Sequence, residues 1–567
     1  MGERRRCGRA DRCTAAVRRP ARLGRRWPAI AIGLALVAAG CERSAPLPPK
    51  VGLLPEGGKK PNVIFVLIDT LRADRLGAYG HARNLTPAMD SIAAEGLVFD
   101  RAVAPAPWTL PSIASLFTSY YPSVHKAYRY VQVQAMVDKK TPAQSVLDER
   151  FETLAEVMKA GGYGTAGVVA NKFMLAEYGF AQGFDHYDTS MSGENTVPGE
   201  RVNAAAFAWL AQRDSDKPLF LYVHYMDVHG PYDAAPQFME PLLDAVEQMP
   251  IAKRTPLTPQ QLQAMNPYLR KPPKQERDPA RYERLKDYRE YWAARYEAGV
   301  AQVDYHLGQL RDGLRQLGLW DDAYVIVTAD HGEALGEHSF PSAAGPRMLW
   351  EHGYSLYQTD LHIPLILRWP RVLPAGKRVA AGASLMDMLP TLAEQLRLRP
   401  PAGVQGESLV DAWSGRVGKE PRRLYAEAVK TWPDTADSRP LTRHEAGFRG
   451  DWKLIKIAQS AWRGQPGGAQ WTLFNVARDP GELQPVNDEK VLADLRDFLR
   501  AQNDQNTQAG KSIEGRLRPA HDLGNLGYVA PSADDQESDE SDAKEESRSP
   551  ASQPAAAASG GDPKKGP

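Results

Sequence analysis

Three stretches decide the fold of this chain: NVIFVLID (residues 62–69), PLFLYVHYMD (218–227) and AYVIVTAD (323–330). Each is a near-continuous apolar run that ends in an aspartate, and strands buried on both faces of a parallel sheet have this composition. Amphipathic stretches of helical period alternate with these runs. We therefore expect an α/β domain in which helices flank a largely parallel central sheet.

The expected α/β domain covers residues 61–415, and a smaller α+β subdomain follows over residues 416–505. That second unit contains two strand candidates, WKLIKI (452–457) and WTLFNV (471–476), and a final amphipathic helix. Residues 506–567 turn acidic and then rich in Ala, Ser, Gly and Pro. We expect an extended, mostly disordered tail there.

A polar, Pro-rich insertion, residues 234–278, lies between the second and third apolar runs. It leads into a long helical pattern over residues 281–317. The insertion contains no recognisable motif. Because loops over the strand ends of such domains set specificity, we expect it to contribute to substrate choice.

The composition allows a large core and gives no sign of a nucleic-acid partner. The chain has 567 residues, of which 43% are hydrophobic, and it contains twelve tryptophans. This suffices for one large domain and an accessory one. The formal net charge is +1, whereas phosphate-backbone binding usually leaves a basic excess.

The cysteines and the N-terminus predict export. Cys7, Cys13 and Cys41 all lie in the first 41 residues, which leaves the folded domain without a disulfide, a thiolate zinc site or a cysteine nucleophile. An arginine-rich stretch precedes the apolar run WPAIAIGLALVAAG (residues 27–40), which is shorter than the about 20 residues of a membrane span but suits a signal peptide.

The end of the signal segment resembles a bacterial lipoprotein cleavage site. Small residues precede Cys41, and a polar, Pro-rich tether follows over residues 42–60. We expect residues 1–41 to be a signal peptide with Cys41 as the lipidated residue. The protein would then be anchored by lipid at the periplasmic face of the cell envelope or at the cell surface. Ordinary signal cleavage and an uncleaved anchor are the alternatives.

Two of the apolar runs deliver candidate metal ligands. Asp69 follows the first run, and Asp330 with His331 follows the third. The carboxyl ends of parallel strands meet at one edge of the sheet, where ligands gather. Carboxylates with an imidazole form a hard site for a divalent cation. A single aspartate after a strand is often only a helix cap, but two with distinctive neighbours favour a site.

Thr109 is the candidate nucleophile. Pro111 near the start of a helical run places Thr109 at a helix N-terminus. The positive field there favours an alkoxide or a bound oxyanion. From the local sequence alone, a simple capping role for Thr109 is the preferred alternative.

An ordered series of motifs carries a resemblance to a known family. The motifs are NVIFVLIDTLRAD (62–74), LGAYG (76–80), TLPS (109–112), GYGT (162–165), HGP (229–231), TADHGE (328–333), HGYSLY (352–357), MDMLPT (386–391) and LFN with DPGE (473–482). Together they resemble the sulfatase family of the alkaline phosphatase superfamily over residues 61 to about 503.

The resemblance implies an alkaline-phosphatase-like fold and assigns a role to each candidate residue. One divalent cation, calcium or manganese ahead of zinc or magnesium, is implied at a site whose ligands would be Asp69, Asp330, His331 and Thr109. The catalytic residues would be Thr109 as nucleophile, His229 beside the leaving group and His352 as a further imidazole contact. Asp227 and His229 could supply ligands for a second metal, although one metal is the simpler reading.

The chain departs from the family pattern at four places. Thr109 stands where sulfatases have the Cys or Ser that becomes formylglycine, and threonine cannot give that aldehyde. Ile113 replaces an arginine, and Thr70 replaces a second aspartate. The usual lysine block is absent, and Asn171 or Lys172 would stand in as substrate contacts.

These departures direct the functional hypothesis. We expect a hydrolase of a sulfate or phosphate ester in a small-molecule, glycan or lipid substrate, with phosphoester chemistry favoured by the unmodified threonine. A sulfatase that dispenses with formylglycine is a second enzymatic reading. A phospho-headgroup transferase and a non-catalytic surface lipoprotein that kept the fold are the further alternatives.

Overall fold

The computed structural model describes residues 50–128, 146–194, 197–213, 216–265, 269–274, 277–340, 347–416, 418, 420–430, 442–459 and 468–514. The predicted signal peptide, Cys41 and most of the predicted tail lie outside these residues. The described residues all belong to one compact unit, Pro48–Pro567. Within them, no helix has the length and apolarity needed to cross a membrane.

An eight-stranded sheet forms the centre of the described structure. Its strands, in spatial order, are β12 (Lys377–Val379), β2 (Leu97–Phe99), β11 (Leu365–Arg368), β7 (Tyr324–Thr328), β1 (Val63–Ile68), β6 (Leu219–Tyr225), β4 (Gly164–Val169) and β5 (His186–Asp188). Neighbouring strands are parallel except where β11 runs antiparallel to β7 and β2. The predicted α/β class with a largely parallel sheet is confirmed.

The three apolar runs of the sequence are the three adjacent strands at the centre of this sheet. β7, β1 and β6 are buried along their whole lengths, as their continuous apolar composition predicts. Val66 pairs with Val223 on one side and with Val327 on the other. This parallel register brings the three strand ends to the same edge of the sheet.

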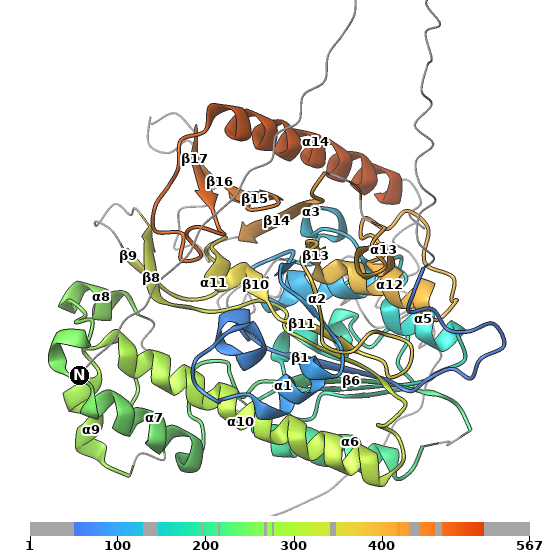
Figure 1. Cartoon of the computed structure of the whole chain (residues 1–567), viewed down its shortest axis with the longest axis horizontal. Coiled ribbons are helices and arrows are strands. Elements are labelled where there is room, and N and C mark those ends of the chain that lie inside the picture. Colours follow the sequence, from blue (N-terminus) through green and yellow to red (C-terminus); the bar gives the residue numbers. More distant parts are fainter. Residues whose placement is uncertain are drawn as a thin grey trace, which may run out of the picture. The chain divides into compact units, whose positions relative to one another are not determined.

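Helices cover both faces of the sheet (Figure 1). One layer consists of α1 (Pro87–Ala94), α6 (Gly199–Leu210) and α10 (Arg289–Gln316). The other consists of α2 (Thr109–Thr118), α5 (Leu154–Ala160) and α12 (Met388–Gln395). Short elements complete the domain: α3 (Pro122–His125), α11 (Gln358–Leu361), α13 (Val410–Trp413) and a small sheet of β10 (His362–Ile363), β3 (Ala102–Val103) and β13 (Ala383–Ser384).

The insertion between β6 and β7 is folded. It contains α7 (Pro236–Gln248), α8 (Pro259–Ala264) and α9 (Pro279–Leu285). The helical pattern predicted as one run is two helices, α9 and α10, separated at residues 286–288. α7 packs on α10, and α8 packs on β9 (Arg347–Glu351), which forms a hairpin with β8 (Ala334–Phe340).

The C-terminal subdomain is an antiparallel sheet covered by one helix. Its strands are β14 (Arg423–Lys430), β15 (Thr442–Arg449), β16 (Trp452–Gln459) and β17 (Gly468–Asn475), in that order. The sequence predicted parts of β16 and β17 and missed β14 and β15. The final helix, α14 (Glu489–Glu514), continues past the predicted boundary at residue 505.

A fully buried ion pair lies where this subdomain meets the α/β domain. Lys453 on β16 and Glu482 are both inaccessible, and Lys453 Nζ lies 2.6 Å from Glu482 Oε1. Both side chains also bond Gln358 at the start of α11: Lys453 donates to its side-chain oxygen at 3.3 Å, and Glu482 accepts from its backbone N–H. Asp360 of α11 in turn accepts the Gly332 N–H through its carbonyl at 2.8 Å.

This pair predicts strongly coupled effects on stability. Removing one charge strands the other in the interior, so Lys453→Met or Glu482→Met should each lower the free energy of unfolding by about 3–5 kcal/mol. The double variant should be more stable than either single variant, because no unpaired charge remains. Urea unfolding of the four proteins measures the coupling.

The exposed pair Arg371–Asp322 provides the matched control, since both side chains are more than 70% accessible. Its variants should change stability by less than about 1 kcal/mol. A Lys453–Glu482 double variant as unstable as the sum of its single variants would contradict this description.

Candidate active site

Thr109 is the first residue of α2 and is buried. Trp108 occupies the cap position in extended conformation, and no side chain caps the helix. The Thr109 hydroxyl is buried and lies 3.4 Å from Asp69 Oδ2 and 3.3 Å from His331 Nε2. The alternative that Thr109 serves only as a helix cap is therefore wrong.

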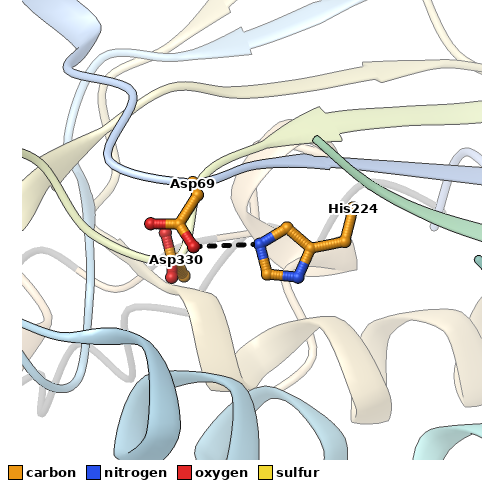
Figure 2. Close-up of side chains that lie close together, drawn as sticks. All are labelled: Asp69, His224 and Asp330. Carbon is orange, nitrogen blue, oxygen red and sulfur yellow. Dashed lines mark hydrogen bonds and ion pairs between the residues drawn. The ribbon is translucent and has the colours of Figure 1, made fainter. Parts of the chain in front are cut away.

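Asp69 and Asp330 meet at the carboxyl ends of β1 and β7, as the sequence predicted, and His224 joins them from β6. Figure 2 shows the two carboxylates beside the His224 imidazole, with His224 Nε2 at 3.2 Å from Asp69 Oδ2. One ligand atom from each residue lies within 4.8 Å of the other two, and all three residues are buried.

His224 is the site residue that the sequence analysis missed. It lies inside the apolar run of β6 and is inaccessible. The signal that could have identified it is a titratable side chain within a strand that is otherwise apolar and buried.

The two carboxylates carry buried oxygens that fit a cation. Asp69 Oδ1 and Asp330 Oδ2 have no hydrogen-bond partner among the described residues. Their other oxygens are satisfied: Asp69 Oδ2 accepts from Asn171 at 2.6 Å, and Asp330 Oδ1 accepts from the backbone of Thr70 and of His331 at 3.2 and 2.9 Å. Buried carboxylate oxygens left unpaired are costly, so this Asp–His–Asp group is a candidate site for a divalent cation.

The pKa shifts of Asp69 and His331 show how the charges in this group stabilise one another. Burial favours the neutral acid of Asp69, but the hydrogen bond from His224 and the nearby His229 and His331 outweigh burial and hold the pKa of Asp69 below its usual range. For His331, burial opposes the charged form, yet Asp330 and Asp69 raise its pKa to about 9. The imidazoles beside Asp69 thus stabilise its carboxylate in the charged form.

His331 is held in a defined orientation. Its Nδ1 donates to the carbonyl of Gly332 at 2.8 Å, which leaves Nε2 directed at Asp330 Oδ2 (3.2 Å), Asp69 Oδ1 (3.7 Å) and the threonine hydroxyl. A ring fixed in this way by a backbone carbonyl is typical of metal-ligating histidines.

Asn171 belongs to the site, and Lys172 lies outside its described contacts. The Phe173 N–H bonds Asn171 Oδ1 at 2.8 Å, which turns the amide nitrogen towards Asp69 and, at 3.4 Å, the Thr109 hydroxyl. Lys172 is exposed, with its Nζ 5.5 Å from the centre of the Phe173 ring.

His352 lies next to His331, and His229 lies next to His352. The ring centres of His331 and His352 are 4.4 Å apart, and those of His352 and His229 are 5.1 Å apart. His352 Nδ1 lies 3.1 Å from Oε1 of Glu333, a buried carboxyl whose pKa is raised to about 7 by desolvation. The structure therefore places His352 against His331, and His229 against His352.

Asp227 does not join this group. Its carboxylate accepts from Gln302 at 2.7 Å and from the Gly199 N–H at 3.0 Å, where it ties α6 to α10. The option of a second metal bound by Asp227 is therefore not supported by its position.

The residues at two other family departures, Thr70 and Ile113, are also buried. Thr70 adopts a left-handed backbone with φ of +60°, which is rare for a β-branched residue, and its hydroxyl lacks a partner among the described residues. Ile113, in place of the family's arginine, is inaccessible on α2. Neither residue supplies charge to the site.

Comparison with known proteins gives a consistent result. Residues 61–398 match the profile of the Sulfatase family, and residues 349–509 match the profile described as N-sulphoglucosamine sulphohydrolase, C-terminal. The chain is 24% identical over 500 residues to the N-acetylglucosamine-6-O-sulfatase of Bacteroides thetaiotaomicron, which covers 76% of this chain and 83% of that protein.

Solved structures share the fold. A protein in complex with its substrate D-glucosamine-2-N,6-O-disulfate superimposes with a TM-score of 0.60 at 20% identity, covering 79% of this chain and 99% of that one. The phosphonate monoester hydrolase of Agrobacterium radiobacter gives 0.59 at 21% identity, with coverages of 79% and 96%. Because the Sulfatase match spans more than half of the chain, this protein belongs to the sulfatase family and is a sulfatase-like ester hydrolase.

Proposed function

We propose that this protein is a metal-dependent hydrolase of a phosphate or sulfate ester in which unmodified Thr109 is the nucleophile, and that phosphoesters are its preferred substrates. The observation that carries the proposal is the position of the Thr109 hydroxyl. It lies between the Asp69 carboxylate and the His331 imidazole at the N-terminus of α2 and plays no part in capping the helix.

Asp69 and Asp330 would hold the cation through their unpaired oxygens, with His224, His331 and Thr109 beside them. The carboxylate oxygens suit calcium or manganese, with magnesium as an alternative, and the imidazoles beside them make zinc a further alternative. A cation bound there would favour the alkoxide form of the threonine and neutralise charge on the transferred group.

The chain's own residues then account for the group transfer. The Thr109 oxygen gives up its proton and forms a bond to phosphorus while the bond to the leaving oxygen breaks, and the leaving oxygen takes up one proton, so that the step releases and consumes one proton each. Asn171 supports the threonine oxygen through its amide N–H. Water then attacks the phospho-threonine, releases the phosphoryl product and restores the hydroxyl.

Two buried residues favour phosphorus over sulfur. Threonine at position 109 cannot yield formylglycine, and Ile113 supplies no cation to hold a sulfate. Sulfatases and phosphonate monoester hydrolases both occur among proteins that share this fold, so the preference rests on these residues rather than on the fold.

We further propose that the enzyme acts outside the cytoplasm as a lipoprotein anchored through Cys41. This rests on the sequence of residues 1–60, from the arginine-rich start to the polar tether. Its substrate would be a small molecule, glycan or lipid ester.

Metabolic labelling with a fatty-acid analogue should mark the wild-type chain and not Cys41→Ser.

Thr109→Ala should lower kcat/KM by about 1,000-fold or more, because no other hydroxyl replaces the nucleophile. Thr109→Ser keeps a hydroxyl and should retain measurable turnover. The assay uses purified protein with manganese, calcium or zinc against aryl phosphate monoesters, diesters and aryl sulfate. Activity that survives in Thr109→Ala excludes this nucleophile, and turnover restricted to aryl sulfate reverses the preference for phosphorus.

Thr70→Asp should make the metal-free protein less stable and its stabilisation by manganese larger. A third carboxylate beside Asp69 and Asp330 repels them without a cation and attracts the cation when it is present. Each tenfold gain in affinity adds about 1.4 kcal/mol of stabilisation at saturating metal.

Thr70→Asn is the neutral control for this prediction. Asparagine tolerates a left-handed backbone, so this variant should be about 1 kcal/mol more stable than the wild type without metal. Thermal melts with manganese and with a chelator measure both effects. Equal responses of the aspartate and asparagine variants to manganese would argue against a cation beside residue 70.

Asn171→Ala should reduce kcat/KM about 10- to 100-fold, since it removes a hydrogen bond that orients both Asp69 and Thr109. Asn171→Asp should be worse, because it adds negative charge where a donor is needed. Steady-state kinetics of these variants and of Lys172→Ala distinguish the two candidate substrate contacts. A larger loss in Lys172→Ala would transfer the role to the lysine.

A further inference from the structure

A strap, residues 50–54, precedes the first strand and is bonded to α12. The Leu54 N–H donates to the carbonyl of Gln395, the last residue of that helix, at 2.7 Å. Gln395 Nε2 donates in turn to the Gly52 carbonyl at 2.9 Å. Part of the segment that the sequence predicts as a tether therefore belongs to the folded domain.

The strap is also closely packed against the domain. The Val51 carbonyl accepts from Trp413 Nε1 at 2.8 Å, and Leu54 is 6% exposed. Gly52 has a φ of +87°, and a Cβ there would lie 2.7 Å from Leu373 Cδ2 and 2.9 Å from Trp413 Nε1. A side chain at this position would be strained in both conformation and space. The strap is therefore a fixed element of the domain.

The strap and the candidate active site lie at opposite edges of the central sheet. Gln395, which bonds the strap, accepts from the hydroxyl of Tyr324, the first residue of β7, at 2.7 Å. Asp330 follows Tyr324 by six residues, which is about 20 Å along an extended chain. In Figure 1 the blue segment before β1 lies at the right of the sheet, and the β8–β9 hairpin, which follows the candidate metal ligands, lies at the left.

The strap limits how far the domain can move from a lipid on Cys41. An extended chain spans at most about 3.5 Å per residue. Lys50, which is paired with Glu394 of α12, follows Cys41 by nine residues, so the intervening chain reaches about 30 Å. Without the strap the intervening chain would extend to Pro61, twenty residues after Cys41, and would reach about 70 Å. The strap thus removes more than half of that reach.

We propose that the strap keeps the candidate active site turned away from the bilayer that holds the lipid on Cys41. The substrate is then a water-soluble ester and not a lipid of that bilayer; this assignment rests on the proposed function. For the site to face the bilayer, the chain before Lys50 would have to pass the depth of the sheet, about 20 Å, and the helices that cover it. A chain stretched to nearly its full length loses most of its conformational entropy, which disfavours that arrangement.

Distances to the bilayer test this orientation without any turnover. No cysteine follows Cys41 in the sequence, so one introduced cysteine gives a unique labelling site in the lipidated chain. Glu56→Cys places a fluorophore near the strap, and Lys172→Cys places one beside Asn171; both native side chains are exposed. In phosphatidylethanolamine and phosphatidylglycerol vesicles that contain an acceptor lipid, energy transfer should be stronger from position 56. Stronger transfer from position 172 overturns the orientation.

A strap that is released by substitution tests its role directly. Gly52→Val should release it, because the added side chain has no room beside Leu373 and Trp413. Gly57→Val is the matched control, since Gly57 also has a positive φ, +68°, but nothing lies within 4 Å of its Cβ position. Trypsin should cut Gly52→Val after Lys50 about 10-fold faster than the wild type or the control, because cleavage follows the population of the open form. Equal cleavage of all three chains contradicts a fixed strap.

Turnover in vesicles tests the substrate class. Hexadecyl 4-nitrophenyl phosphate inserts into the bilayer that holds the enzyme, and methyl 4-nitrophenyl phosphate is its water-soluble counterpart. With manganese, the lipidated wild type should hydrolyse the hexadecyl ester in vesicles no faster than Cys41→Ser added from solution. Gly52→Val should hydrolyse it about 10-fold faster than the wild type, since the longer reach lets the site meet the bilayer.

The methyl ester is the control for these rates, because Gly52→Val, Gly57→Val and Cys41→Ser should all match the wild type on it. Each rate on the hexadecyl ester is compared with the rate on the same ester in detergent micelles. The corresponding aryl sulfates are used if the wild type turns over only sulfate. Faster hydrolysis of the hexadecyl ester by the anchored wild type than by Cys41→Ser overturns the proposed substrate class.

Failure of the proposed function gives different results. Turnover that survives in Thr109→Ala contradicts the nucleophile and does not affect the energy-transfer measurement. A wild-type chain that carries no lipid contradicts the anchor and this orientation together. A lipidated chain that is inactive on every ester, with stronger transfer from position 56, contradicts the hydrolase and supports the orientation.

Discussion

The structure depends on the burial of two carboxylates at neighbouring strand ends. Asp69 and Asp330 are inaccessible, and each has one oxygen that makes no hydrogen bond among the described residues. The groups that surround these carboxylates stabilise their negative charge. They are the imidazoles of His224 and His331, the Asn171 amide, and the backbone N–H groups of Thr70 and His331. Two buried anions that still have oxygens without a hydrogen bond make this group a candidate site for a cation.

The residues that differ from the family pattern, at Thr109 and at the positions of Thr70, Ile113 and Asn171, are all consistent with an unmodified hydroxyl at position 109. Threonine replaces the precursor of an aldehyde, Ile113 replaces an arginine, and neutral Thr70 and Asn171 replace charged residues. The site has lost residues of both signs, and the one gained donor, Asn171, bonds the nucleophile and a carboxylate together. Under the proposed function, these exchanges replace formylglycine chemistry with direct attack by the Thr109 hydroxyl, which needs orientation more than additional charge.

The C-terminal subdomain supports the site through buried polar contacts. The Lys453–Glu482 pair holds Gln358 at the start of α11, and Asp360 of the same helix receives the Gly332 N–H directly after His331. From the other side, Arg72 bonds the Glu333 carbonyl. The segment 330–333, which contains the candidate metal ligands Asp330 and His331, is thus held by hydrogen bonds from two sides.

The sequence by itself determined the central strands, the family and most of the site. Continuous apolar runs that end in aspartate are typical of central parallel strands. The motifs predicted that Thr109, Asp69, Asp330 and His331 share one site, and the structure brings these residues together. It left β14 and β15 undetected and could not distinguish a capping threonine from a nucleophile. Only the tertiary structure shows that His224 lies beside Asp69 and that Asn171, rather than Lys172, contacts the site. It also shows that Asp227 bonds Gln302 away from the site and that Glu333 pairs with His352. The local sequence determines periodicity and therefore the type of each element. Which side chains meet at the site depends on strand register and on packing between segments more than a hundred residues apart in the sequence.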